Sequence, residues 1–177
     1  MPRTIVITGV TSGFGRATAA VFIKEGWNVA GTGRRKERLD ALKAEWGDAF
    51  LPLELDMRDK SAVFAALERL PAPWSEPDVL VNNAGLALGL APSQEADLDD
   101  WETMIDTNIK GLLYATRALL PGMTARNRGH IVNLGSTAGT YPYKGGNVYG
   151  GTKAFVKQFS LNLRTDLLGT AVRVTNI

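Results

Sequence analysis

Cysteine is absent from this 177-residue chain, and histidine occurs only once, as His130. Without thiols the chain can form no disulfide, no zinc–thiolate site and no thiol nucleophile. One histidine is too few for a histidine-rich metal centre, so we expect no metal site. His130 starts a predicted strand after Arg128-Gly129, where we expect a surface position rather than a place in a catalytic triad.

Strong charge and long hydrophobic runs are missing as well. The 20 Lys and Arg residues are nearly balanced by 18 Asp and Glu, and no basic run of five residues occurs, which argues against a nucleic-acid partner. The longest apolar stretches are interrupted by Asn82 and Asn83 or by Arg117, so no segment is predicted to span a membrane. An apolar run begins directly after Met1-Pro2-Arg3, and we therefore expect no signal peptide and a cytoplasmic protein.

Short β-branched segments alternate with longer helical patterns along the chain. Hydrophobic residues make up 45% and charged residues 21%, as in an ordinary globular protein, and the length suits one domain, residues 1–177. The strand centres are continuously apolar, which is typical of strands buried on both faces of a parallel sheet. We predict six strands, at residues 3–8, 28–32, 49–55, 78–82, 130–134 and 171–177.

Helical patterns occupy residues 13–25, 35–46, 60–70, 98–125 and 149–168. Asp97, Asp99 and Asp100 suit the start of the fourth helix, because acids cap a helix and complement its dipole there. Pro121-Gly122 is expected to break that helix near its end. The strict alternation of strands and helices predicts an α/β fold: a Rossmann-type, doubly wound parallel sheet with helices on both faces.

A glycine-rich turn joins the first predicted strand to the first predicted helix. Its residues are Gly9, Val10, Thr11, Ser12, Gly13, Phe14 and Gly15. Gly9 permits a tight turn, Gly13 lets the backbone approach a pyrophosphate, and Gly15 allows close packing of helix on strand. Because the free N–H groups of a helix start attract phosphates, we interpret the segment as a dinucleotide site. The alternative is a tight turn alone.

Two arginines follow the second predicted strand, where a chain specific for NAD carries an acid for the ribose 2′-hydroxyl. That position is Gly33, and Arg34 and Arg35 come directly after it. Guanidinium groups bind a 2′-phosphate through paired hydrogen bonds, whereas an acid would repel it. The pair therefore favours NADP. The alternative is a solvated helix start, although two cations oppose the helix dipole there.

Residues after the third and fourth strands complete the predicted cofactor site: Asp56, Met57, Asn83, Ala84 and Gly85. Asp56 is placed to accept the adenine amino group, while its alternative role, a helix cap, suits Asp59 and Ser61 better. The three residues after the fourth strand can line the ribose of the cofactor or can hold the strand ends together. Both interpretations stay open.

Tyr149 and Lys153 lie four residues apart in the last predicted helix, so they share one helix face. A phenol with an ordinary pKa of about 10 is a poor proton donor near pH 7, and lowering that pKa by about three units takes about 4 kcal/mol. One ammonium about 4 Å away supplies on the order of 4 kcal/mol at an effective dielectric constant near 20. The pair therefore predicts an acid–base group for hydride transfer to or from a carbonyl.

Ser136 and Asn108 complete the predicted catalytic group. Ser136 follows the fifth strand, where its hydroxyl can donate to the substrate oxygen and hold it against Tyr149; a turn serine is the alternative. Asn108 lies within the fourth predicted helix, where asparagine is a poor helix former. It can kink the helix, or it can bind a water molecule that links Lys153 to solvent.

These segments resemble the short-chain dehydrogenase/reductase family over nearly the whole chain. The resemblance lies in Thr8-Gly-x3-Gly13-x-Gly15, Asn82-Asn-Ala-Gly85, Asn108, Ser136 and Tyr149-x3-Lys153, which match the family's motifs in order and spacing. Residues 82–89, 100–108 and 145–149 are further similar to its NADP-dependent 3-hydroxy acid dehydrogenase subgroup.

The resemblance implies an NADP-dependent oxidoreductase of small 3-hydroxy acids: serine, L-allo-threonine, and 3-hydroxypropionate with malonic semialdehyde. It implies Tyr149 as the acid–base group, Lys153 on the nicotinamide ribose, Ser136 on the substrate and Asn108 in a proton relay. It also implies a homotetramer joined by the helices that begin near residues 98 and 149. Two alternatives remain, a 3-oxoacyl reductase and a non-catalytic nucleotide-binding protein, although a nucleotide sensor would have no need of the full catalytic group.

The end of the sequence departs from the family pattern. Family members continue past the sixth strand with a Pro-Gly motif at the nicotinamide and a loop over the substrate, whereas this sequence ends at Ile177. Elements of that kind exclude water and select the substrate. We therefore expect this chain to be incomplete at its C-terminal end, to bind NADP weakly and to turn over slowly.

Overall fold

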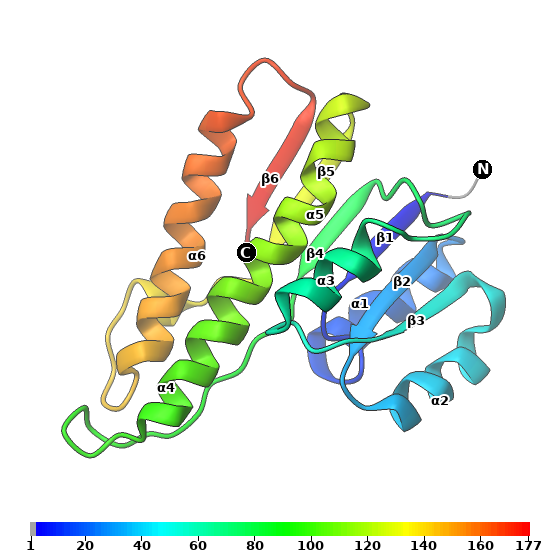
Figure 1. The fold of residues 1–177 in the computed structure, drawn as a ribbon. Helices are drawn as coiled ribbons and strands as arrows, with labels where there is room; N and C mark the ends of the chain where they lie inside the picture. Colours follow the sequence, from blue (N-terminus) through cyan, green and yellow to red (C-terminus); the bar gives the residue numbers. More distant parts are fainter. Residues whose placement is uncertain (1–2) are drawn as a thin grey trace.

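A fully parallel sheet of six strands organises the protein, in the order β3-β2-β1-β4-β5-β6 (Figure 1). The structure is a computed structural model and describes residues 3–177. The strands are β1 (Thr4–Ile7), β2 (Asn28–Gly33), β3 (Phe50–Glu54), β4 (Val79–Asn82), β5 (Gly129–Asn133) and β6 (Val172–Asn176). This is the strand order of doubly wound dinucleotide-binding sheets, so the predicted fold class is confirmed.

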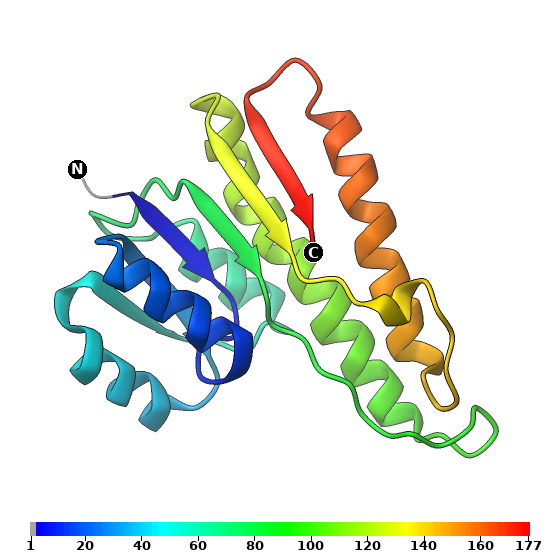
Figure 2. The same cartoon turned by 180° about the vertical axis from the view of Figure 1, so that it is seen from behind.

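Helices cover both faces of the sheet (Figures 1 and 2). One face, over β1 to β3, is covered by α1 (Gly13–Lys24) and α2 (Lys36–Trp46). The other face is covered by α3 (Lys60–Leu67), α5 (Leu112–Ala125) and α6 (Asn147–Asp166). Short 3-10 segments, η1 (Gly47–Ala49) and η3 (Thr137–Gly139), precede β3 and follow β5.

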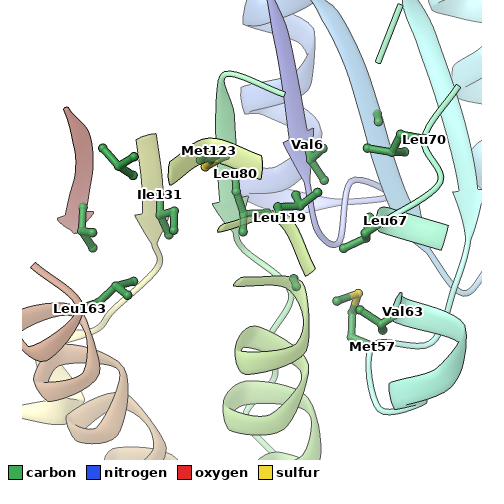
Figure 3. Packing of buried hydrophobic residues seen from close by; sticks show 14 of the residues in the cluster. Val6, Met57, Val63, Leu67, Leu70, Leu80, Leu119, Met123, Ile131 and Leu163 are labelled. Atoms are coloured by element: carbon green, nitrogen blue, oxygen red, sulfur yellow. The ribbon is translucent and has the colours of Figure 1, made fainter. Parts of the chain in front are cut away.

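The central strand β1 shows why the strands are continuously apolar. Ile5 and Ile7 pack on the side of α1 and α2, Val6 packs on the side of α3, α5 and α6, and all three are fully buried. Figure 3 shows the second side, where side chains of β1, β4 and β5 meet those of the covering helices. Because successive side chains point to opposite faces and both faces are covered, apolar residues predominate at successive positions of such a strand.

The predicted helix 98–125 keeps its direction but changes its winding. α4 (Leu98–Ile105) passes into a π-helical segment, η2 (Asp106–Gly111), and α5 follows directly. The change includes Asn108 and Gly111, two residues that are poorly suited to a regular helix. At the start of α4, the Asp97 carboxylate accepts a hydrogen bond from the N–H of Asp99 (2.9 Å), which confirms the predicted cap.

The break expected at Pro121-Gly122 is wrong, since α5 continues through both residues to Ala125. Proline removes one backbone donor from the helix, and the carbonyl that loses its partner belongs to Arg117. Pro121 and Arg117 both lie on the exposed side of α5, where water can satisfy that carbonyl. Other boundaries differ by a few residues: α6 begins at Asn147, so Tyr149 lies inside its first turn.

No helix within residues 3–177 combines the length and the hydropathy needed to cross a bilayer. The same part of the chain brings together no group of three or more His, Cys, Asp or Glu side chains that could hold a metal ion.

His130 lies at the amino end of β5, at the opposite end of that strand from the predicted catalytic residues. Its Nε2 is 2.8 Å from Oγ1 of Thr175, and Arg173 is its partner in register on β6. Partial burial, together with the charge of Arg173, holds the pKa of His130 below its ordinary value.

We expect His130 to lower the stability of the protein in mild acid. In the unfolded chain the imidazole of His130 binds a proton at about pH 6.5, whereas in the folded protein it binds one only at lower pH. The contribution of neutral His130 to the free energy of unfolding is therefore complete above about pH 6.5, and it is lost as the pH falls through the lowered pKa of the folded state. Thermal unfolding followed from about pH 7.5 to 5 should show a smaller decline of Tm for His130→Gln than for the unsubstituted protein. Identical declines would rule out this contribution.

Candidate active site

A cleft of about 910 Å³ opens beyond the carboxyl ends of β1 and β4. The strand order reverses between these two neighbours, which is where open α/β sheets bind ligands. Most of the predicted site residues line this cleft: Gly9, Thr11, Ser12, Gly13, Phe14, Arg34, Arg35, Asp56, Met57, Asn83, Ala84, Gly85, Tyr149 and Lys153. The others, Val10, Gly15, Asn108 and Ser136, lie outside its lining.

The glycine turn places its residues through backbone geometry. Gly9 (φ +74°) and Gly13 (φ +55°) adopt conformations that other residues rarely take. A Cβ on Gly15 would collide with the carbonyl oxygen of Gly9, whereas a Cβ on Gly13 would meet nothing within 4 Å. Gly15 therefore serves the packing of α1 on β1, while Gly13 leaves the backbone open toward the cleft. Val10 points the other way and is fully buried.

Asn83 ties this turn to β4. Its Nδ2 donates to the carbonyl oxygens of Thr8 (2.8 Å) and Gly9 (2.9 Å). In return, Oγ1 of Thr8 accepts hydrogen bonds from the backbone N–H groups of Asn83 (3.1 Å) and Ala84 (2.9 Å). Of the two interpretations of this segment, the contacts seen for Asn83 are those that hold the strand ends together, and Ala84 and Gly85 contribute to the cleft wall.

Arg34 and Arg35 form a basic end of the cleft at the start of α2. Nη2 of Arg35 donates to Oγ1 of Thr11 at 3.0 Å, so this arginine links α2 to the glycine turn. Thr11 also packs against Gly33, where an added Cβ would lie 2.5 Å from Cγ2 of Thr11. The position at which an acid would select NAD is therefore closed to a side chain while Thr11 keeps its place.

Arg58 lines the cleft beside Asp56 and is not among the residues predicted from the sequence. Its Nη2 donates to the Asp56 carboxylate at 2.7 Å, and its Nε lies 3.1 Å from each carboxylate oxygen. These hydrogen bonds lower the pKa of Asp56 below its ordinary value. The sequence does contain a signal for Arg58, namely an arginine two residues after an acid at the end of a strand. The cap of α3 is Asp59, as predicted, which accepts from the N–H of Ala62.

Lys153 is buried at the other end of the cleft, with 8% of its surface exposed. Its Nζ donates to the carbonyl oxygen of Leu134 at 2.7 Å and lies 5.8 Å from the centre of the Tyr149 ring. Burial lowers the pKa of Lys153. Helical spacing thus places the Tyr149 ring and the Lys153 ammonium on the same side of α6 and in the same cleft, and the end of β5 supplies an acceptor that the spacing did not reveal.

Asn108 lies in η2 next to Lys153, and its side chain is bound within the protein. Oδ1 accepts from the N–H of Leu86 (2.9 Å), and Nδ2 donates to the carbonyl oxygen of Leu86 (2.8 Å) and to Oγ1 of Thr152 (3.1 Å). Both N–H donors of this amide are therefore used by the protein. The kink considered for Asn108 is replaced in the structure by a change of helical winding at η2, and its place in a proton relay stays a prediction.

Ser136 stands at the start of η3 and is exposed. Its Oγ accepts a hydrogen bond from the N–H of Ala138 (3.1 Å), which is the turn role considered as the alternative. The hydroxyl hydrogen remains free to donate to another group. Leu134 and Gly135, directly before Ser136, line the cleft.

A doubly wound sheet with a glycine-rich phosphate turn at its switch point, and a tyrosine–lysine pair in the same cleft, defines a dinucleotide-binding protein equipped for proton transfer. The sequence matches the short chain dehydrogenase family over residues 3–177. The protein belongs to this family.

Relatives within the family are similar over nearly the whole chain. The chain is 63% identical over 173 residues to the NADP-dependent 3-hydroxy acid dehydrogenase of Salmonella typhi, a match that covers 98% of this chain and 70% of that protein. It is 59% identical over 177 residues to the serine 3-dehydrogenase of Rhizobium radiobacter, covering 100% of this chain and 71% of that protein.

Two solved structures of serine dehydrogenase have the same fold. The enzyme from Escherichia coli superposes with a TM-score of 0.96 at 61% identity, over 98% of this chain and 80% of that one. A closed form of serine dehydrogenase complexed with NADP⁺ superposes with the same TM-score and identity, over 98% of this chain and 70% of that one.

Gly15→Ala should destabilise the protein, because the added methyl meets the backbone carbonyl of Gly9. Urea unfolding should show a loss of about 1–3 kcal/mol, or a chain that fails to fold. Gly151→Ala in α6 is the matched control: its methyl meets nothing within 4 Å, and replacing a helical glycine is expected to stabilise by up to about 1 kcal/mol. A Gly15→Ala protein as stable as the unsubstituted one would contradict the packing role.

Proposed function

We propose that the protein is an NADP-dependent oxidoreductase that interconverts the C3 hydroxyl and the C3 carbonyl of small 3-hydroxy acids. Serine, L-allo-threonine and 3-hydroxypropionate are the candidate substrates, with malonic semialdehyde as the product of the last. One observation carries the proposal: a single cleft contains the phosphate turn, a basic end and the Tyr149–Lys153 pair. The names of the relatives, 3-hydroxy acid dehydrogenase and serine 3-dehydrogenase, support the substrate class.

The residues of the cleft fit NADP at each of its parts. The open backbone at Gly13 and the first N–H groups of α1 suit a pyrophosphate. The guanidinium groups of Arg34 and Arg35 suit a 2′-phosphate, and the carboxylate of Asp56 can accept from the adenine amino group. A nicotinamide cofactor, when bound, supplies the hydride donor or acceptor that the reaction requires.

Tyr149 is the acid–base group of the proposal and moves the proton of the substrate hydroxyl. Lys153 acts beside it as the cation, and the hydrogen bond from its Nζ to the carbonyl oxygen of Leu134 fixes the position of that charge at a buried place. Charges act more strongly on one another in such a poorly hydrated place. Ser136 would complete the group by donating its hydroxyl hydrogen to the substrate oxygen.

A homotetramer and a cytoplasmic location form the remaining part of the proposal. Apolar side chains are exposed on the two helices that the family resemblance places at the interface. Leu98 and Ile105 on α4 are 65% and 37% exposed, and Leu161 on α6 is 44% exposed. Exposed apolar side chains on neighbouring helices support burial against another subunit.

The proposal predicts that the protein reduces NADP⁺ in the presence of serine, L-allo-threonine or 3-hydroxypropionate, followed by the absorbance of NADPH. Tyr149→Phe keeps the ring and removes only the hydroxyl. It should lower this rate by about 10²- to 10⁴-fold, the usual contribution of an acid–base group, and should leave NADPH binding nearly unchanged.

Fluorescence titration with NADPH separates binding from turnover in the same samples. Binding without turnover of any hydroxy or oxo acid would point to a non-catalytic nucleotide-binding protein. Turnover restricted to 3-oxoacyl substrates would identify a 3-oxoacyl reductase and would rule out the assignment as a 3-hydroxy acid dehydrogenase.

Gly33→Asp alone should fail to create an NADH site, although it supplies the acid found in NAD-specific chains. The new side chain would lie against Cγ2 of Thr11. Thr11→Ser removes that methyl and keeps the hydroxyl that Arg35 binds. The double variant should bind NADH about tenfold more tightly than Gly33→Asp, since a hydrogen bond to a carboxylate contributes about 1.5–3 kcal/mol.

NADH fluorescence measures this difference, and Thr11→Ser alone serves as the control for loss of the methyl. Equal NADH affinities for Gly33→Asp and the double variant would show that Thr11 is not the obstacle.

A further inference from the structure

Arg58 is a charged residue of the cleft to which the proposed function assigns no role. It lies in the turn between β3 and α3, two residues after Asp56. Met57 between them is buried, and it packs so closely against Gly111 of η2 that a Cβ there would lie 2.9 Å from Cβ of Met57. Met57 thus anchors the turn, while Asp56 and Arg58 on either side of it line the cleft.

Two adjacent nitrogen atoms of the Arg58 guanidinium, Nε and Nη2, donate hydrogen bonds to the Asp56 carboxylate. Nη2 binds Oδ2 at 2.7 Å, and Nε lies 3.1 Å from both oxygens. The backbone N–H of Arg58 adds a third donor to Oδ1 at 3.0 Å. Such a planar, charge-assisted arrangement fixes the orientation of the carboxylate, which a lysine could not do.

The position of Asp56 creates an electrostatic problem for a cofactor with a 2′-phosphate. Asp56 and Arg34 follow neighbouring strand ends, because the N–H of Leu55 donates to the carbonyl oxygen of Gly33 at 2.9 Å, and both residues line the cleft. An uncompensated carboxylate in that place would weaken the attraction of the basic end for a phosphate. Arg58 offsets this charge, and it does so without leaving the oxygens of Asp56 unable to accept a further hydrogen bond.

We infer that Arg58 is a positioning residue for the adenosine part of NADP and that it acts through Asp56. It holds the Asp56 carboxylate in the orientation from which the adenine amino group is bound, and it cancels the charge of that carboxylate beside the 2′-phosphate. Only the effect on charge favours NADPH over NADH, because the two cofactors share the adenine and differ in the 2′-phosphate. The inference rests on the proposed cofactor, and it concerns a side chain outside the phosphate turn and outside the Arg34–Arg35 pair.

A double-mutant cycle tests this role by fluorescence titration with NADPH and with NADH. The four proteins are the unsubstituted chain, Arg58→Gln, Asp56→Asn and the Asp56→Asn/Arg58→Gln double variant. Arg58→Gln should weaken NADPH binding about five- to tenfold and NADH binding less than about twofold, and the difference should shrink in high salt. The Asp56→Asn/Arg58→Gln double variant has lost both charges of the pair and keeps the same net charge, so its ratio of NADPH to NADH affinity should return to within about twofold of that of the unsubstituted protein.

Arg38→Gln is the matched control, because Arg38 is an exposed arginine of α2 outside the cleft lining and should leave both affinities unchanged. An unchanged ratio of NADPH to NADH affinity in Arg58→Gln would overturn the role of Arg58, and so would a double variant that keeps the weakened preference of Arg58→Gln. A fall in Tm with a parallel loss of both affinities would reveal structural damage and would also overturn it. Failure of the unsubstituted protein to prefer NADPH would overturn the proposed cofactor and this inference together.

Discussion

The carbonyl oxygen of Gly9 is the point on which the arrangement of the cleft depends. It accepts a hydrogen bond from Asn83, which joins β1 to β4, and it also lies beneath Gly15, where α1 rests on the turn. One backbone atom therefore fixes a strand, a turn and a helix relative to one another. Hydrogen bonds from Asn83 and Ala84 to Thr8 complete the connection. A phosphate turn anchored in this way is preorganised, so ligand binding need not order it first.

Several charged groups of the cleft are held by hydrogen bonds to neighbouring residues. Lys153 is largely shielded from water, and its Nζ donates a hydrogen bond to the carbonyl oxygen of Leu134. This hydrogen bond limits the free-energy cost of burying an ammonium. Arg35 is bound by Thr11, and Asp56 is bound by Arg58. Each of these charges thus has a defined place before any substrate or cofactor arrives. This is the condition under which electrostatic groups act most strongly on a reaction.

Much of the fold follows from local patterns. The alternation of apolar runs and helical segments predicted the parallel sheet, Asp97 and Asp59 were recognised as caps from their positions, and the spacing of Tyr149 and Lys153 placed them on one helix face. The prediction failed at Pro121, because the tolerance of an exposed helix for a missing hydrogen bond depends on solvent access. It also missed the π-helical winding around Asn108, which is stabilised by the loop at Leu86.

The sequence alone determined the class of the fold, the glycine-rich turn and the identity of the chemical groups, because periodicity, caps and glycine positions act over a few residues. Only the tertiary structure decided which of these groups touch one another. Asn83 binds Gly9, Thr11 fills the space beside Gly33, and Lys153 binds the carbonyl of Leu134. These contacts join residues that are far apart in the chain, and the order in which the strands pair brings them together; no local pattern records that order.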